Sequence, residues 1–135
     1  MKIYIVIANY YPKISKNLLS GCLKKFKQNN LKNIKIINAP GVYEIPVLIS
    51  KNIKLFNGFV ALGCVIKGQT PHFNYISSAT INALMQLSIN HKKPIGNGII
   101  TCLDKNQAEI RSNPMKKNKG GEAANALISV LENSK

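Results

Sequence analysis

The chain has 135 residues, 45% of them hydrophobic and 18% charged. This composition excludes an intrinsically disordered protein, because a disordered chain lacks the apolar surface that offsets the entropy lost on folding. Nineteen basic against five acidic residues give a net charge of +14, which suggests a polyanion such as nucleic acid as a partner.

The predicted elements alternate between strands and helices from the start of the chain. Residues 2–8 (KIYIVIA) form a nearly continuous β-branched run, which is typical of a strand buried on both faces. Ser15 is then the predicted N-cap of an amphipathic helix. Its apolar residues, spaced for one face of a helix, are Leu18, Leu19, Cys22, Leu23 and Phe26.

The alternation continues to the end of the chain. Further strands are predicted at residues 34–39, 58–65 and 96–102. Further helices are predicted from residue 44 to about 51, from 72 to about 90, and near 105–112 and 120–132. Strands separated by helices of this length indicate right-handed βαβ units and a parallel sheet covered on both faces. We therefore predict one α/β domain over residues 1–135, with no internal repeat or linker.

The lengths of the apolar stretches and the spacing of the cysteines indicate where in the cell the protein is located. The start MKIYIVIANYY is too short for a signal-peptide core, and no later stretch approaches the roughly 20 apolar residues of a membrane span. Cys22, Cys64 and Cys102 are odd in number and widely spaced, so neither a disulfide framework nor a zinc site is indicated. We expect free thiols in a cytoplasmic protein that does not contact the membrane.

The positive charge has a second interpretation. Only one of the nineteen cations is an arginine, Arg111, and lysine, asparagine and isoleucine are abundant, which resembles the composition drift of an AT-rich genome. The lysines are also scattered along the chain. We therefore favour a solvated surface over a nucleic-acid interface, and expect no nucleic-acid partner.

Three loops with polar or glycine-rich sequences follow the predicted strands, at residues 8–12, 39–44 and 63–72. In an open parallel sheet, ligands bind outside the carboxyl ends of the strands, where such loops lead into helices. We therefore expect a binding site at this edge of the sheet.

The third loop, VIKGQTPH, combines a turn with a proton-transfer group. Gly68 permits a tight turn, and residues 69–71 form the predicted first helical turn, whose unpaired N–H groups can hold an anion. Pro71 suits an early helical position. His72 reaches the same space, and histidine titrates near neutral pH, as proton transfer requires. The spacing of a Walker A loop is absent. A structural glycine turn with a capping or core histidine is the alternative.

Three more residues are candidates for ligand contacts. Arg111 lies near a polar loop, and a guanidinium binds phosphate through two parallel hydrogen bonds, although a plain surface arginine is an alternative. Glu44 at a strand-to-helix turn can accept hydroxyl groups of a sugar or polyol, or simply complement a helix N-terminus. Tyr10 offers a stacking face for a heteroaromatic ring, or is an aromatic residue at the sheet edge.

Three motifs carry a family resemblance that covers nearly the whole chain. PGVYEIPV resembles the family's PGAFEIP segment, and ALGCVIKGQTPHFNYI resembles its ALGCVIRGETPHFDYV segment. GNGIITC, QAEIR and NKGGEAA together resemble its C-terminal signature. The family is that of the 6,7-dimethyl-8-ribityllumazine synthases, which catalyse the penultimate step of riboflavin biosynthesis.

The resemblance implies a flavodoxin-like three-layer sandwich with a central parallel sheet flanked by helices. It implies condensation of 5-amino-6-(D-ribitylamino)uracil with 3,4-dihydroxy-2-butanone 4-phosphate, releasing phosphate and water, without a metal or a cofactor. It further implies a homo-oligomer, a pentamer or a multiple of pentamers, with the sites at subunit interfaces.

The resemblance also assigns residues to the pyrimidine substrate. Tyr10 matches the aromatic residue that stacks on the pyrimidine, and Asn97 matches a position that lines this pocket from a neighbouring subunit. The segment that holds the ribityl chain comprises Val42, Tyr43 and Glu44. The segment whose backbone pairs with the pyrimidine edge comprises Cys64, Val65 and Ile66.

A second group matches the residues of phosphate binding and proton transfer. His72 matches the proton-transfer residue, and Arg111 matches the arginine that grips the phosphate. Gln69 and Thr70 match the phosphate-binding turn. The remaining matches are Lys119, which adds positive charge, and Glu122, near the acid that orients the histidine.

Several positions depart from the family pattern. Tyr10 stands where phenylalanine or tryptophan is usual, and Lys67, Gln69 and Asn74 also differ, but none of these changes removes a proposed catalytic group. The first strand begins at Lys2, whereas many members carry a preceding segment that adds to a neighbour's sheet, so assembly is expected to be affected.

Two other functions remain open at this stage. One is a related enzyme of the same pathway, such as the archaeal-type riboflavin synthase. The other is a non-catalytic oligomeric shell or polyanion-binding protein with the same fold. The joint presence of Glu44, His72 and Arg111 favours an enzyme over a shell.

Overall fold

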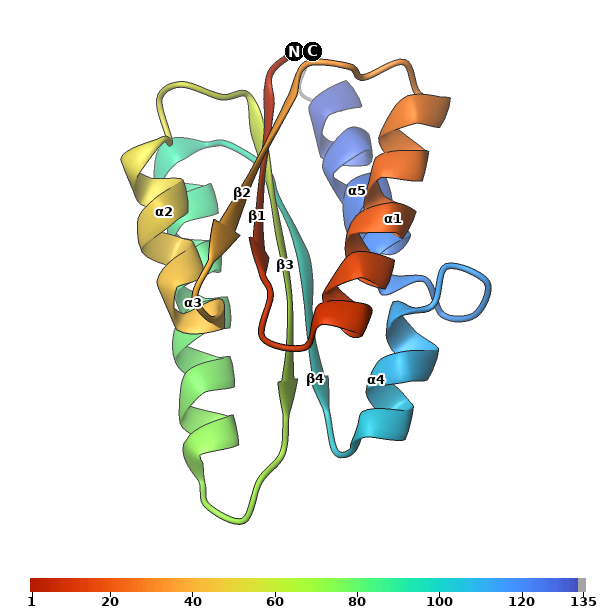
Figure 1. Ribbon diagram of the computed structural model, residues 1–135. Helices are drawn as coiled ribbons and strands as arrows, with labels where there is room; N and C mark the ends of the chain where they lie inside the picture. The colour runs from red at the N-terminus through yellow and green to blue at the C-terminus, as the bar shows by residue number, and fades with distance from the viewer. Residues whose placement is uncertain (134–135) are drawn as a thin grey trace.

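Four parallel strands form the centre of the fold in a computed structural model, which describes residues 1–133 (Figure 1). They are β1 (Ile3–Ala8), β2 (Ile34–Ala39), β3 (Gly58–Ile66) and β4 (Ile95–Cys102). Their order across the sheet is β2-β1-β3-β4. Each strand lies within one residue of its predicted bounds, so the predicted strands and the parallel sheet are confirmed.

Helices cover both faces of this sheet. On one face lie α1 (Pro12–Gln28), α4 (Lys105–Ser112) and α5 (Lys119–Glu132), and on the other lie α2 (Ile45–Lys51) and α3 (His72–His91) (Figure 1). A single 3₁₀ turn, η1 (Val42–Glu44), leads into α2. This arrangement confirms the predicted flavodoxin-like three-layer sandwich.

The core has two halves, one on each face of the sheet. Ile3, Ile5 and Ile7 of β1 pack in the half beneath α1 and α5. Tyr4 and Val6 point the other way, into the half beneath α2 and α3. Successive side chains of a strand face opposite sides of its sheet, so a strand with helices on both faces must be apolar throughout. This is why residues 2–8 carry a nearly continuous apolar run.

The first helix begins earlier than predicted. Proline lacks a backbone N–H and has a helical φ, so Pro12 can occupy the first helical position, and Tyr11 is the N-cap residue. The predicted N-cap, Ser15, is wrong: it is buried inside the first turn. Its hydroxyl instead donates a hydrogen bond to the carbonyl of Ala8 at 2.9 Å, at the end of β1.

The helix after the third loop begins at His72, as predicted, but the turn before it is not helical. Pro71 is the N-cap of α3 and the helix begins at His72, so the predicted helical turn at residues 69–71 is wrong. The physical reason is the restriction that a proline places on the residue before it, which disfavours the helical conformation at Thr70. Residues 67–71 therefore form an exposed loop between β3 and α3.

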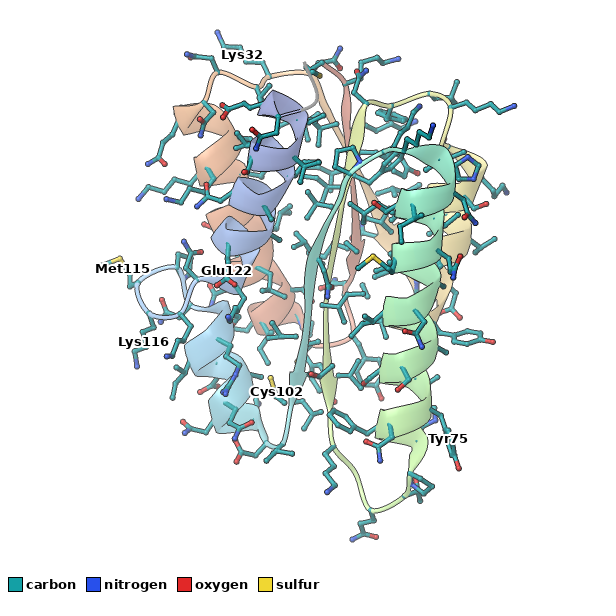
Figure 2. All side chains as sticks on the ribbon, turned by 180° about the vertical axis from the view of Figure 1, so that it is seen from behind. Lys32, Tyr75, Cys102, Met115, Lys116 and Glu122 are labelled. Carbon is teal, nitrogen blue, oxygen red and sulfur yellow. The ribbon has the colours of Figure 1, made fainter. Side chains whose placement is uncertain are left out.

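Lysines are exposed on several separate elements. Lys24 and Lys27 lie on α1, and Lys116 lies in the loop before α5. In Figure 2, Lys32 and Lys116 lie far apart on the surface. Within residues 1–133, no helix is long and apolar enough to cross a membrane.

Candidate active site

A cavity of about 530 Å³ opens at the carboxyl ends of the strands. The loops after β1 and β2, the end of β3 and the start of α3 form its wall. Eight of the thirteen predicted site residues line it: Tyr10, Val42, Tyr43, Glu44, Cys64, Val65, Ile66 and His72. These residues come from four segments of the chain, which the parallel sheet brings to one edge.

Close packing against β3 places the η1 segment at the cavity. A Cβ atom at Gly63 would lie 2.6 Å from Cγ1 of Val42, so only a glycine lets η1 approach β3 this closely. The side chain of Val42 is buried in this contact. Tyr43 and Glu44 follow it directly and therefore reach the cavity wall.

Aromatic rings stand at the mouth of the cavity. The side chain of Tyr10 is 71% exposed and that of Tyr43 is 62% exposed. The ring of Tyr10 meets that of Tyr11 edge to face, with ring centroids 4.9 Å apart and an interplanar angle of 75°. The exposed faces of such rings provide apolar surface for a planar ligand.

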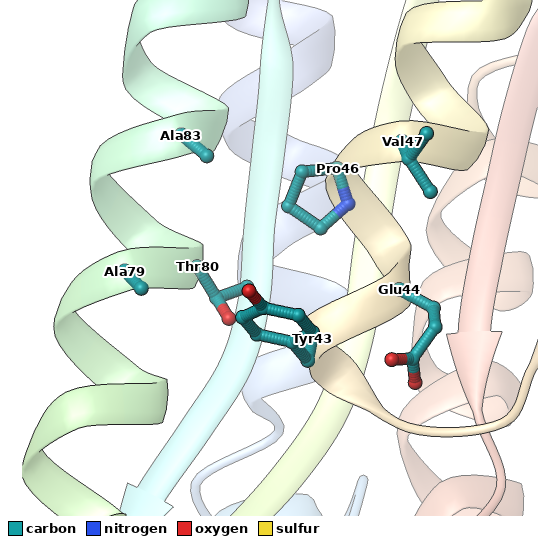
Figure 3. Close-up of a pocket in the computed structure, with 7 residues that line it drawn as sticks. All are labelled: Tyr43, Glu44, Pro46, Val47, Ala79, Thr80 and Ala83. Carbon is teal, nitrogen blue, oxygen red and sulfur yellow. The ribbon is translucent and has the colours of Figure 1, made fainter.

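Tyr43 and Glu44 also border a smaller cavity of about 380 Å³ between α2 and α3. Figure 3 shows the ring of Tyr43 extending from the η1 segment toward Thr80 of α3. Within residues 1–133, the buried hydroxyl of Thr80 has no hydrogen-bond partner. The two cavities thus meet at Tyr43 and Glu44.

His72 stands at the first position of α3 and is exposed to the cavity. Its backbone N–H donates a hydrogen bond to the hydroxyl of Thr70 at 3.5 Å. Within residues 1–133, the backbone N–H groups of Gly68, Gln69 and Thr70 have no hydrogen-bond partner. Gln69 and Thr70 lie in the exposed loop beside the cavity and do not line it.

Besides Gln69 and Thr70, three further predicted residues lie outside the cavity of their own chain. Asn97 is exposed on β4, and its side-chain oxygen accepts a hydrogen bond from the N–H of Ile99 at 3.0 Å. Arg111 lies half-buried in the last turn of α4. Lys119 begins α5. The fold gathers these residues on β4, α4 and α5, away from the cavity wall.

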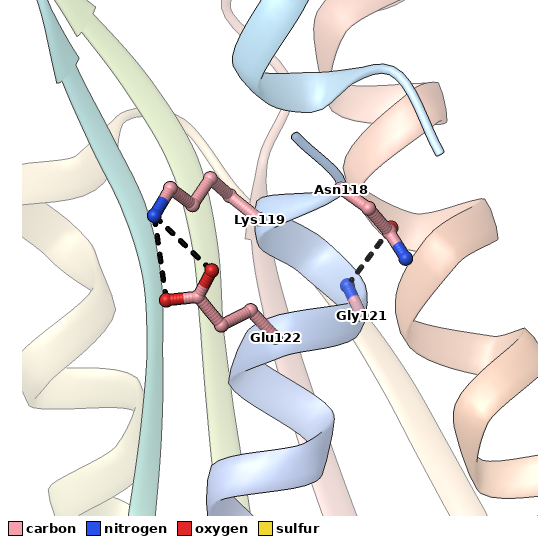
Figure 4. A network of polar contacts seen from close by, with 4 residues as sticks. All are labelled: Asn118, Lys119, Gly121 and Glu122. Carbon is pink, nitrogen blue, oxygen red and sulfur yellow. Dashed lines mark hydrogen bonds and ion pairs between the residues drawn. The ribbon is translucent and has the colours of Figure 1, made fainter. Parts of the chain in front are cut away.

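Glu122 is paired with Lys119 and does not contact His72 within residues 1–133. The Nζ atom of Lys119 lies 3.1 Å from a carboxylate oxygen of Glu122, and the side chain of Asn118 accepts a hydrogen bond from the N–H of Gly121 at 3.2 Å (Figure 4). Both contacts stabilise the first turn of α5, where a cap and an acidic residue complement the helix N-terminus.

Four residues of the cavity wall carried no site assignment from the sequence: Tyr11, Pro40, Gly41 and Ile76. Pro40 and Gly41 belong to the loop already expected at the site. Tyr11 is adjacent to Tyr10, and Ile76 lies one helical turn after His72, so spacing along the chain was the available signal for both.

Cys64 lies on the cavity wall with a buried thiol. Burial, and secondarily the neighbouring Cys102, raise the pKa of Cys64 to about 12. Burial also raises the pKa of Cys102, and the nearby charge of Arg111 opposes this shift. A buried, protonated thiol is a poor nucleophile, so Cys64 is not a reactive cysteine.

Slow alkylation at neutral pH should reveal this protonated thiol. We expect iodoacetamide to modify Cys64 about 100-fold more slowly in the folded protein than in concentrated guanidinium chloride, because little thiolate is present and the sulfur is buried. Mass spectrometry of digests taken over time measures the rate at each cysteine, with Cys22 as the buried internal control. Equal rates for Cys64 in the folded and unfolded protein would contradict this assignment.

Comparisons with known proteins agree with the motifs and the fold. Residues 1–135 match the family model for 6,7-dimethyl-8-ribityllumazine synthase. A protein of that name from Buchnera aphidicola subsp. Baizongia pistaciae is 42% identical over 135 residues, covering 96% of this chain and 84% of that protein.

Two further relatives carry the same name. The protein from Methylocella silvestris is 39% identical over 133 residues, which cover 93% of this chain and 80% of that protein. The protein from Bartonella henselae is 39% identical over 135 residues, which cover 97% of this chain and 86% of that protein. The chain therefore belongs to the 6,7-dimethyl-8-ribityllumazine synthase family, whose members are transferases of the riboflavin pathway.

Proposed function

We propose how the residues of this chain perform the lumazine synthase reaction. The enzyme condenses 5-amino-6-(D-ribitylamino)uracil with 3,4-dihydroxy-2-butanone 4-phosphate and releases phosphate and water. The main observation in support is that one cavity at the strand ends combines Tyr10, Glu44 and His72, one residue for each of three tasks. These tasks are stacking on the ring, holding the ribityl chain and moving protons.

The pyrimidine substrate occupies the cavity between the ring of Tyr10 and the end of β3. The exposed ring of Tyr10 stacks on the heterocycle, and the backbone of residues 64–66 pairs with its polar edge. The segment at the opposite wall, Val42, Tyr43 and Glu44, holds the ribityl chain, with the carboxylate of Glu44 accepting its hydroxyl hydrogens. These remote contacts orient the ring for closure.

His72 moves protons between the reacting groups. The amine of one substrate attacks the ketone of the other, and protons must be transferred as the imine forms and as phosphate leaves. Holding both substrates beside His72 also removes the entropic cost of their encounter during reaction, an effect of up to about 7–11 kcal/mol.

The phosphate binds at the loop before α3. The free N–H groups of Gly68, Gln69 and Thr70 supply donors, and Arg111 supplies the charge that stabilises the leaving phosphate. Because Arg111, Asn97 and Lys119 lie away from the cavity of their own chain, a neighbouring copy supplies them.

An oligomer is therefore part of the proposed function. Large apolar side chains are exposed on the α2 and α3 face, including Val47, Met85 and Ile89. Exposed apolar surface on two adjacent helices is typical of a subunit interface. We propose a homo-oligomer built from one domain per chain, a pentamer or a multiple of pentamers, in the cytoplasm, where its three free thiols stay reduced.

His72→Ala tests the proposed proton transfer. With both substrates present, the absorbance and fluorescence of the lumazine product measure turnover above the spontaneous reaction. We expect His72→Ala to lower kcat about 100-fold, because general acid–base catalysis contributes at least this much.

His91→Ala is the matched control. His91 is exposed at the opposite end of the same helix, α3, so its removal should leave kcat unchanged. A similar loss in both variants would remove His72 from the mechanism. A correctly folded wild type that forms no product would contradict the proposed function as a whole.

A further inference from the structure

Tyr11 lines the cavity from a position that is held on two sides. As the N-cap of α1, it accepts a hydrogen bond at its carbonyl from the N–H of Ser15 at 2.9 Å. Its half-buried side chain packs against the core half beneath α1 and α5. Proline at position 12 further restricts the backbone of Tyr11 to extended conformations. The orientation of Tyr11 is thus set by the fold.

Tyr10, by contrast, depends on this neighbour. Its side chain is 71% exposed, and within residues 1–133 its one aromatic contact is the edge-to-face contact with Tyr11. An exposed tyrosine exchanges among rotamers, and binding a planar ligand selects one of them at an entropic cost. A fixed ring beside Tyr10 lowers that cost by favouring one orientation before the ligand arrives.

Tyr11 lines the cavity together with Cys64 at the end of β3. Burial raises the pKa of Tyr11, and the neighbouring Cys64 and Tyr10 raise it further. The phenol is therefore neutral at physiological pH, beside the β3 segment whose backbone faces the ligand. Tyr11 thus contacts the ring of Tyr10 and shares the cavity wall with the β3 segment proposed to pair with the pyrimidine edge.

We propose that Tyr11 is a positioning residue for the pyrimidine substrate: it holds the stacking ring of Tyr10 in one orientation at the cavity mouth. The inference rests on the proposed function, in which Tyr10 stacks on the pyrimidine. Because the phosphate site lies at the loop before α3 and not at Tyr11, the effect of Tyr11 is confined to the pyrimidine substrate.

Replacing the ring of Tyr11 tests the inference. The probe is a pyrimidine analogue with a nitro group in place of the reacting 5-amino group, which can bind but cannot condense. By calorimetry we expect Tyr11→Leu to weaken its binding about three- to tenfold, the range that a lost aromatic pair implies. Tyr11→Phe keeps the edge-to-face contact and should bind nearly as the wild type does.

Steady-state kinetics provide the readout that a purely structural role would not give. In Tyr11→Leu, KM for the pyrimidine should rise while KM for the phosphate substrate stays within about twofold of the wild type. Tyr75→Leu is the matched control, because it removes the same kind of ring at a position outside the cavity. Tyr75 projects from α3 and, like Tyr10, is 71% exposed (Figure 2). Tyr11→Met carries the same expectation as Tyr11→Leu and keeps more apolar contact with the core, should the leucine variant fold poorly.

Unchanged analogue binding in a folded Tyr11→Leu or Tyr11→Met protein would overturn the inference, as would equal changes in both KM values. A wild type that binds the analogue but makes no lumazine would contradict the proposed function, and the calorimetric comparison would still decide the role of Tyr11. A wild type that does not bind the analogue would overturn both.

Discussion

Gly120→Ala should lower the free energy of unfolding by about 3 kcal/mol, the upper range for overpacking by a single added group. Gly120 lies in the first turn of α5, directly against α1. A Cβ atom there would lie 2.7 Å from the carbonyl carbon of Leu18 and 2.9 Å from its Cα atom. These are backbone atoms, so no side-chain rotation can relieve the clash, and the two helices must separate.

Helix propensity acts in the opposite direction and is too small to compensate. Alanine is favoured over glycine in a helix by about 1 kcal/mol. Any net decrease in the free energy of unfolding must therefore come from the contact with α1. Denaturant unfolding of the two proteins measures the difference.

Gly68→Ala is the matched control for Gly120→Ala. No heavy atom lies within 4 Å of a Cβ atom at Gly68, and its φ is not positive, so its stability should change by less than about 0.5 kcal/mol. Equal stability of the two variants would mean that α1 and α5 do not pack as closely as described.

Arg111→Ala should lower kcat/KM for the phosphate substrate on the order of 10³-fold. Arg111 is the one arginine of the chain, and no carboxylate among residues 1–133 forms an ion pair with it. Its guanidinium is therefore available to the phosphate, where two parallel charge-assisted hydrogen bonds strengthen as negative charge grows on the leaving group. KM for the phosphate substrate should rise strongly, and pyrimidine binding should weaken less.

Two variants separate geometry from charge in this prediction. Arg111→Lys keeps the charge without the planar fork and should recover only part of the activity. Lys105→Ala removes one positive charge from the exposed start of the same helix, α4, and should leave both KM values unchanged. Equal effects of Arg111→Ala on the two substrates would remove Arg111 from phosphate binding.

Mixed oligomers test whether Arg111 serves a neighbouring copy. If each site combines His72 of one chain with Arg111 of another, co-refolded His72→Ala and Arg111→Ala chains regenerate some sites with both residues intact. Mixtures should then be more active than either variant alone. Mixtures with no gain would place both residues in one chain's site.

The sequence alone determined the layer architecture and most of the cavity wall. Apolar runs and helical spacing are local patterns, and they predicted strands such as residues 2–8 and 58–65 because burial on both faces demands such runs. The carboxyl ends of parallel strands must share one edge, which is why three loops distant in sequence were expected at one site. The family motifs then assigned Tyr10, Glu44 and His72 to a cavity that contains all three.

Only the tertiary structure decided how closely distant segments approach. The place of Tyr11 in the cavity wall depends on contacts between elements far apart in the chain. The close approach of Gly63 to Val42, and that of Gly120 to Leu18, also depend on such contacts. Close packing in three dimensions sets these distances, and a linear pattern of apolar and polar residues does not encode them.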